Sequence, residues 1–172
     1  MKRIWVALLL IGLSSACQKK TVPVNNVNSS GSSKLLFEQT PEPYIVISIK
    51  RTSCFGKCPA YEASIYSDGK VTYHGISNVE MRGIFVSSIN TADINKILVK
   101  AFEIKYFDMA DQYPVNGEKI ADLPSAITSI SCTGHKKKIT NKYQGPESLK
   151  TFEEMIDLEI YKLKYKTTDA QK

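Results

Sequence analysis

The chain has 172 residues, of which 42% are apolar and 9% aromatic, with nine glycines and seven prolines. This composition suffices for one hydrophobic core and excludes a collagen-like, low-complexity or wholly disordered chain. Lys and Arg number 23 against 17 Asp and Glu, so the formal charge is +6, a mild excess typical of a solvated surface. No aromatic residues alternate with the densest basic run, residues 136–138, so the charge does not predict nucleic-acid binding.

The N-terminus has the three parts of a secretory signal in order. Lys2 and Arg3 precede an apolar run, residues 4–13, which is followed by small residues and Cys17. A run of ten residues is too short for a spanning helix, which needs about 20. We therefore predict a signal peptide over residues 1–16 and export of the protein.

The residues before Cys17 resemble the lipobox of bacterial lipoproteins, in which the cysteine thiol receives a diacylglycerol. Ser14 stands where that pattern prefers Leu. The resemblance implies lipidation of Cys17 and a lipid-anchored protein of the bacterial cell envelope that faces the periplasm or the cell surface. The alternative is ordinary signal cleavage after Ala16, because Ser14 and Ala16 also satisfy a small-x-small rule.

Composition divides the rest of the chain into a tether, a domain and a tail. Residues 17–43 are rich in Asn, Ser, Gly and Lys and poor in large apolar side chains, which predicts a flexible tether. Residues 44–165 carry the periodic apolar patterns of a single folded domain, and residues 166–172 are expected to be a polar tail.

The first half of this domain predicts strands. Residues 45–50 alternate with period two, and the runs 60–66 and 70–76 flank Ser67-Asp68-Gly69, which is a hairpin signal. A three-residue loop with Gly69 at the left-handed position pairs Ile65 with Val71 and keeps apolar residues on one face, whereas a two-residue turn mixes the faces. The residues predicted to face the core are Tyr61, Ala63, Ile65, Val71 and Tyr73.

The second half predicts two helices around a hairpin. A fourth strand is expected over residues 79–86, and Asn90 is expected to cap a helix. The buried face of that helix should hold Ile94, Ile97, Leu98, Ala101 and Phe102. After the aperiodic segment 106–123 come strands over 125–132 and 135–142. A last helix should have Pro146 at its first position and an apolar side made of Leu149, Phe152, Ile156, Ile160 and Leu163.

These elements give an α+β fold class. The expected architecture is an antiparallel sheet, made of a four-stranded meander and a later hairpin, with two helices packed on one face. The chain order is four strands, a helix, two strands and a helix.

Three segments, residues 47–61, 65–69 and 122–129, resemble a family of uncharacterised bacterial envelope domains. The first contains the signature Cys-Phe-Gly-x-Cys-Pro, here from Cys54 to Pro59. Many members of that family carry lipoprotein signals. The resemblance implies a single extracytoplasmic domain and carries no catalytic residue to this chain.

Four cysteines define the sharpest local feature. If Cys17 is lipidated, one disulfide can form among the other three, and we predict Cys54–Cys58 because the two lie close in one connection. The short loop gives about 2 kcal/mol in the chain-entropy model, less than half of what a Cys54–Cys132 bridge would give. Cys132 shares an apolar alternating face, which suits a buried free thiol.

The disulfide allows two interpretations. It can simply staple a loop, or it can present Arg51, Phe55 and Lys57 as a rigid contact surface.

An alternative to both is thiol-redox or copper chemistry, because the Cys-x3-Cys-Pro loop with a distant His resembles copper-delivery proteins. The register argues against this, since His74 falls about 13 Å along a strand from Cys58 and His135 lies beside another turn.

No catalytic motif accompanies these features. The sequence has no Gly-x-Ser-x-Gly elbow, no His-Glu-x-x-His and no glycine-rich phosphate loop. The loop carboxylates Asp108, Asp111, Glu118 and Asp122 lack the spacing of a calcium loop. We therefore predict a non-catalytic binding or assembly module without cofactor or metal, whose partner is an envelope protein or glycan.

Overall fold

The computed structural model describes residues 34–117 and 122–167. The predicted signal peptide, Cys17 and residues 17–33 of the predicted tether lie outside these described residues. Within the described ranges, no helix is both long and apolar enough to cross a membrane.

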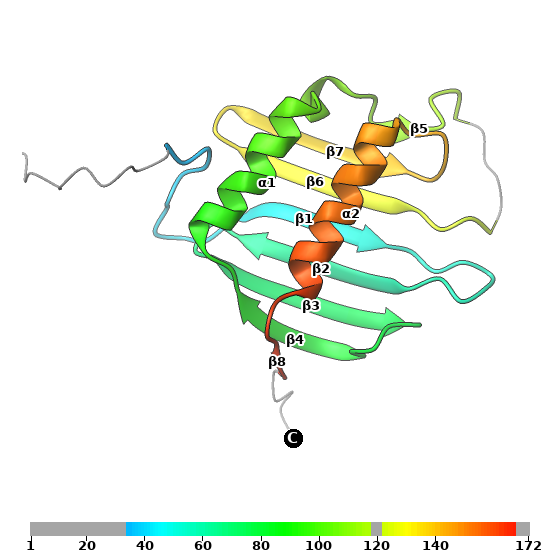
Figure 1. Cartoon of the computed structure of the whole chain (residues 1–172), viewed down its shortest axis with the longest axis horizontal. Helices are drawn as coiled ribbons and strands as arrows, with labels where there is room; N and C mark the ends of the chain where they lie inside the picture. The colour runs from blue at the N-terminus through cyan, green and yellow to red at the C-terminus, as the bar shows by residue number, and fades with distance from the viewer. Residues whose placement is uncertain (1–33, 118–121, 168–172) are drawn as a thin grey trace, which may run out of the picture. The chain divides into compact units, whose positions relative to one another are not determined.

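The domain is built on an eight-stranded sheet with the spatial order β5-β7-β6-β1-β2-β3-β4-β8 (Figure 1). Neighbouring strands are antiparallel except for β5 and β7, which are parallel. The strands are β1 (Ile45–Arg51), β2 (Ala60–Tyr66), β3 (Lys70–Ser77), β4 (Gly83–Ser88), β5 (Gln112–Tyr113), β6 (Ala126–Cys132), β7 (His135–Asn141) and β8 (Lys166–Thr167).

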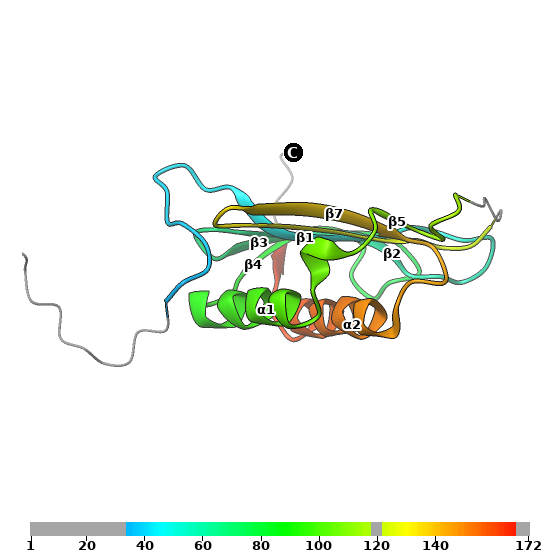
Figure 2. The same ribbon diagram turned by 90° about the horizontal axis from the view of Figure 1, so that it is seen from above.

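Two helices cover one face of this sheet, as Figure 2 shows edge-on. They are α1 (Thr91–Glu103) and α2 (Glu147–Tyr161), and a short 3-10 helix, η1 (Tyr106–Asp108), follows α1. The predicted α+β class is confirmed. The sequence did not indicate β5 and β8, because each has only two residues and so no readable alternation.

The β2–β3 hairpin has the predicted register. Ile65 lies opposite Val71, and Ala63 lies opposite Tyr73. Gly69 has a φ of +85°, and a Cβ there would lie 2.6 Å from the carbonyl oxygen of Ile89. The loop therefore needs glycine both for its left-handed backbone and for this close approach.

The fourth strand begins later than predicted. Residues 79–82 precede β4, which starts at Gly83, where φ is +110°. The preceding loop passes so close to β3 that a Cβ at Gly75 would lie 1.7 Å from the carbonyl oxygen of Met81. Val79 and Met81 were included in the predicted strand. Both residues are apolar and pack partly against the core, but they do so from a loop.

The helices follow their predicted apolar periodicity with small differences. The Asn90 side chain caps α1 by accepting a hydrogen bond of 2.8 Å from the N–H of Asp93. Phe102 is 37% exposed at the edge of the covered face, contrary to prediction. In α2, Pro146 is the cap residue and Leu163 lies beyond the helix end, where it is only partly buried.

The packed part of the domain begins before residue 44. Phe37 is 3% exposed in the core. The N–H of Leu36 donates to Asn95 Oδ1 at 2.8 Å, and the N–H of Thr133 donates to the Leu36 carbonyl at 2.9 Å. Residues 34–37 thus pack against the domain, although the sequence assigned them to the tether.

Candidate functional site

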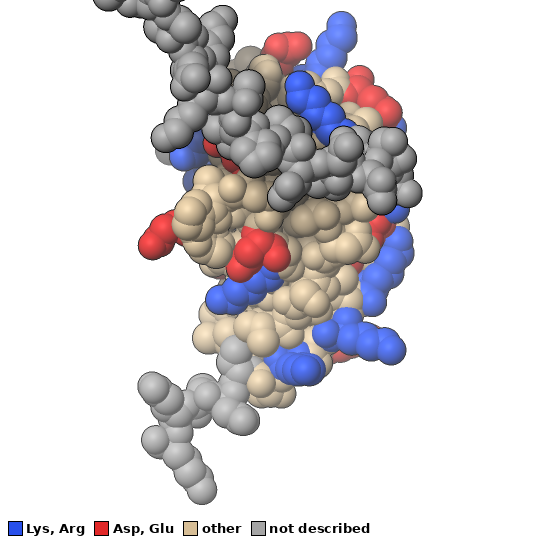
Figure 3. All heavy atoms as spheres, turned by 90° about the vertical axis from the view of Figure 1, so that its left-hand side faces the viewer, with Lys and Arg blue, Asp and Glu red and all other residues tan. Residues whose placement is uncertain are grey.

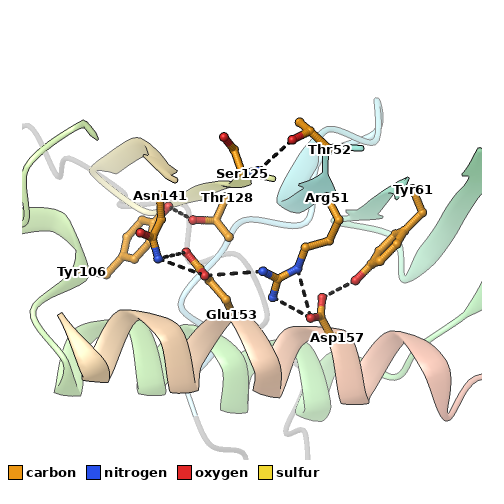
Figure 4. A network of polar contacts seen from close by, with 9 residues as sticks. All are labelled: Arg51, Thr52, Tyr61, Tyr106, Ser125, Thr128, Asn141, Glu153 and Asp157. Carbon is orange, nitrogen blue, oxygen red and sulfur yellow. Dashed lines mark hydrogen bonds and ion pairs between the residues drawn. The ribbon is translucent and has the colours of Figure 1, made fainter. Parts of the chain in front are cut away.

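Arg51 is the centre of a polar network between the sheet and α2 (Figure 4). It continues the alternation of Ile47 and Ile49, so its side chain points toward the helices from the end of β1. Its Nη2 and Nε donate to Asp157 Oδ2 at 2.6 and 3.2 Å. Burial alone would lower the pKa of Arg51, but Asp157 outweighs this effect and the pKa is raised.

Tyr61 on β2 completes the partners of Asp157. Its hydroxyl donates to Asp157 Oδ1, so both carboxylate oxygens are engaged. Burial, followed by the charge of Asp157, raises the pKa of Tyr61, which keeps the phenol protonated. The contact joins α2 to the second strand of the sheet.

Glu153, one turn before Asp157 on α2, is 2% exposed. The amide of Asn141 donates to both of its oxygens at 3.2 Å, and Arg51 Nη1 lies 3.7 Å away. Burial raises the pKa of Glu153 to about 7, and Arg51 and Asn141 offset this only in part. The carboxyl group of Glu153 is therefore partly protonated near neutral pH, whereas ordinary surface carboxyl groups are fully ionised there.

Three further hydrogen bonds lie beside the network, and they join η1 to β6 and the end of β1 to the start of β6. The hydroxyls of Tyr106 and Thr128 lie 2.8 Å apart in the buried interior. Thr52 and Ser125 are joined twice, because Ser125 N–H donates to Thr52 Oγ1 at 2.7 Å and Thr52 N–H donates to the Ser125 carbonyl at 3.0 Å. The end of β1 is thus held to the start of β6.

A groove of about 550 Å³ opens beside this network. This volume is within the range of small-molecule sites. Four separate stretches of chain and one helix contribute to its wall, which is lined by Arg51, Thr52, Cys58, Pro59, Pro124, Ser125, Ala126, Asn141, Lys142, Tyr143, Gln144, Gly145, Lys150, Glu153, Glu154 and Asp157.

The disulfide loop borders the groove. Cys54 and Cys58 are bonded as predicted, and Cys132 is a buried free thiol. Phe55 is 93% exposed and Lys57 is also exposed. Arg51 is less exposed than these two residues, since its side chain is 23% exposed and is paired with Asp157 of α2. That these three residues form one contact surface remains a prediction.

The sequence did not single out Glu153 or Asp157, although one signal was available. Glu153 lies four residues after Leu149 and three before Ile156, in the middle of the predicted apolar side of the helix. A carboxylate at such a position needs a buried partner. The alternation from Ile47 through Ile49 to Arg51 supplies that partner, about 100 residues earlier.

Neither histidine lies with the cysteine loop. His74 is exposed and lies opposite Glu62 on the β2–β3 hairpin. His135 packs on Phe102 and Phe107, with ring centroids 5.2 and 4.9 Å apart, at the end of the sheet away from the loop (Figure 1). In the described parts of the chain, no three His, Cys, Asp or Glu residues group as metal ligands.

The basic run lies on strand β7, and one carboxylate of the acidic segment pairs with it. Lys136 and Lys138 are exposed, and Lys137 pairs with Asp111 at 2.6 Å. Strand β5 pairs only with Thr140 and Asn141 of β7, and lysines discourage further pairing along such an edge. On the end of the domain seen in Figure 3, lysine and arginine lie mainly toward the margins and form no continuous patch. Glu118 lies outside the described residues.

The fold and the groove define a class of protein, a two-layer α+β domain with a stapled loop beside a polar groove. Residues 45–160 match the model of the family described as a domain of unknown function, DUF6438. The chain belongs to this family. No curated protein matches the chain.

Proposed function

We propose that the protein is a non-catalytic binding or assembly module of the bacterial envelope and that the groove is its ligand site. In this proposal a signal peptide directs export, Cys17 carries the lipid anchor, and the residues after it tether the domain. The Cys-Phe-Gly-x-Cys-Pro signature forms the stapled rim of the site. The partner is an envelope protein or glycan.

One observation carries the groove assignment. Two segments that suggested a family resemblance, residues 47–61 and 122–129, lie about 60 residues apart in the sequence. Both contribute to the wall of the same groove, the first through Arg51, Thr52, Cys58 and Pro59, the second through Pro124, Ser125 and Ala126. A packing role alone would not require both segments to meet at an open cavity.

The chemistry of the wall favours binding over catalysis. Asp157 uses both oxygens, one on Arg51 and one on Tyr61, and Glu153 accepts two hydrogen bonds from Asn141. Such satisfied groups hold a fixed shape and charge distribution, which lowers the entropy lost when a ligand binds.

The groove assignment can be tested by nuclear magnetic resonance on isotope-labelled protein. Chitotriose and tri-alanine serve as probes for a glycan and a peptide. Saturable shifts of the amide signals of residues 142–145 and 150 by either probe would support the assignment. Shifts confined to the uncovered face of the sheet, or no saturable shift with either probe, would contradict it.

Lipidation is tested separately by metabolic labelling with a fatty-acid analogue. We expect incorporation in the wild type and none in Cys17→Ala. Incorporation that persists in Cys17→Ala, or its absence from both proteins, would reject the anchor.

The thiol-redox or copper alternative retains one supporting observation, since Cys54 and Cys58 are only half-buried and therefore open to reductants and metal donors. Titration of reduced protein with Cu(I) discriminates the two functions. Stoichiometric binding that disappears in the Cys54→Ser, Cys58→Ser double variant would favour this alternative over an inert staple.

A further inference from the structure

The groove is lined by three carboxylates of α2 and, toward the start of that helix, by two lysines, and we infer that it binds a short zwitterionic ligand, such as a tripeptide with free termini, by both of the ligand's charged groups. This inference rests on the proposed binding function and names the ligand class for the same site.

The three carboxylates lie along α2. Glu153, Glu154 and Asp157 line the groove there, and Arg51 is the single cation among them. Arg51 is already committed to Asp157 at 2.6 Å and lies 3.7 Å from Glu153. When all three carboxylates are ionised, they and Arg51 together carry a net charge of about −2. The ammonium group of a ligand would partly neutralise this charge.

The two lysines lie toward the start of the same helix. Lys150 is in the first turn of α2, and Lys142 precedes the loop that leads into it, and both line the groove. The N-terminus of a helix adds a partial positive charge to this part of the groove. Lys150 is only loosely paired with Glu147, at 3.9 Å and with both side chains mostly exposed, so its ammonium group is free to turn toward a ligand carboxylate.

The separation of the lysines from the carboxylates sets the ligand length. Along α2, Lys150 lies three residues before Glu153 and seven before Asp157, which corresponds to about 5 Å and about 10 Å along the helix axis. An extended tripeptide spans about 10 Å between its ammonium and carboxylate groups. The groove volume of about 550 Å³ accommodates a ligand of this size.

The proton on Glu153 supports the same assignment. Its pKa of about 7 means that the free site carries a proton there much of the time at neutral pH. An ammonium group near Asp157 and Glu153 would stabilise the ionised carboxyl group, so ligand binding should release protons in this pH range.

The test compares tri-alanine with its N-acetyl form and its C-terminal amide, using calorimetric titration of the purified chain. We expect each blocked form to bind at least about tenfold more weakly, because each loses one charged contact. Lys150→Gln should weaken tri-alanine but leave the amide unchanged, whereas Glu154→Gln should weaken tri-alanine but leave the N-acetyl form unchanged.

The matched controls are Lys162→Gln and Glu159→Gln, an ion pair of 2.9 Å on the same stretch of chain whose residues do not line the groove. Both variants should bind tri-alanine like the wild type. Equal affinity for free and blocked peptides, or equal effects of Lys150→Gln and Lys162→Gln, would overturn the inference. If blocked peptide or chitotriose still shifts the groove signals, only the ligand class fails. If no probe does, the proposed function fails as well.

Discussion

The two helices cover the same face of one sheet, yet they do so with different chemistry. The buried side of α1 is apolar apart from Asn95, which accepts a hydrogen bond from the backbone of Leu36. The buried side of α2 carries Glu153 among its apolar residues, with Asp157 beside them. Helix α1 is thus a packing element, whereas α2 both packs and forms the wall of a charged groove.

This difference indicates that the buried charges of α2 contribute less to the stability of the domain than apolar residues would. A buried ion pair seldom stabilises a protein more than apolar residues of the same size. Helix α1 shows that an apolar helix face can cover this sheet. The charges of α2 are therefore better explained by the groove beside them than by the packing of the helix.

The largest expected effect comes from Arg51→Gln. It leaves Glu153 and Asp157 without their cation, and breaking a buried pair in this way costs about 3–5 kcal/mol. Urea unfolding at pH 8 measures the loss. At pH 5 part of the stability should return, because protonation of Glu153 removes one uncompensated charge.

Leu98→Ala on α1 is the matched comparison, since Leu98 is fully buried. It should cost a similar amount, about 3 kcal/mol, but by the same amount at both pH values. If Arg51→Gln costs less than about 1 kcal/mol, or shows no more pH dependence than Leu98→Ala, the contrast between the helices is wrong.

Glu153→Gln should show a smaller, pH-specific effect. The folded-state pKa of Glu153 is raised from 4.5 to about 7 by burial, so this group favours the folded state most below pH 4.5. That contribution is lost as the pH rises to about 7, and it amounts to roughly 2–3 kcal/mol. Unfolding measured from pH 4.5 to 8 should show this decline in the wild type.

The Gln variant should lack that part of the decline, so that it gains stability relative to the wild type as the pH rises. Glu159→Gln is a suitable control, because Glu159 is on the same helix but outside the groove lining. Parallel pH profiles for the wild type and Glu153→Gln would show that Glu153 titrates as an ordinary carboxyl group.

Local signals in the sequence were sufficient for much of the fold. The β2–β3 register followed from Gly69 and from keeping apolar residues on one face, and the start of α1 followed from the cap at Asn90. The packing of Phe37 depends on distant parts of the chain, and the start of β4 at Gly83 depends on how the preceding loop packs against β3. No local pattern encodes such contacts.

The site was predicted only in its local part. The Cys54–Cys58 pairing could be derived because both residues lie in one short connection. The network could not, because the partner of Arg51 is 106 residues away on α2. Arg51 was predicted to lie in a contact surface, and Glu153 and Asp157 were not singled out, whereas the packing of α2 on β1 brings the three together.

Removal of the disulfide should have a smaller effect than the loss of Arg51. The Cys54→Ser, Cys58→Ser double variant should unfold about 2 kcal/mol more easily, because the bridge restricts only a five-residue loop of the unfolded chain. Thermal or urea unfolding measures this. Reductant should destabilise the wild type equally and the double variant not at all. A loss above about 4 kcal/mol would mean that the loop supports the core rather than the rim of the groove.

The smallest effect on stability is expected for Phe55→Ala. Phe55 is 93% exposed, so its removal should change the free energy of unfolding by no more than about 0.5 kcal/mol. Phe102→Ala should cost more, since Phe102 of α1 packs against Phe107 and His135.

An exposed aromatic side chain on a disulfide-closed loop is well suited to anchor a partner, because little conformational freedom is lost on contact. A photo-crosslinking amino acid placed at position 55 should therefore capture a specific partner that position 102 does not, and reduction of the disulfide should weaken the capture. Equal capture at both positions would show that the loop beside α2 is no more a contact surface than the rim of α1.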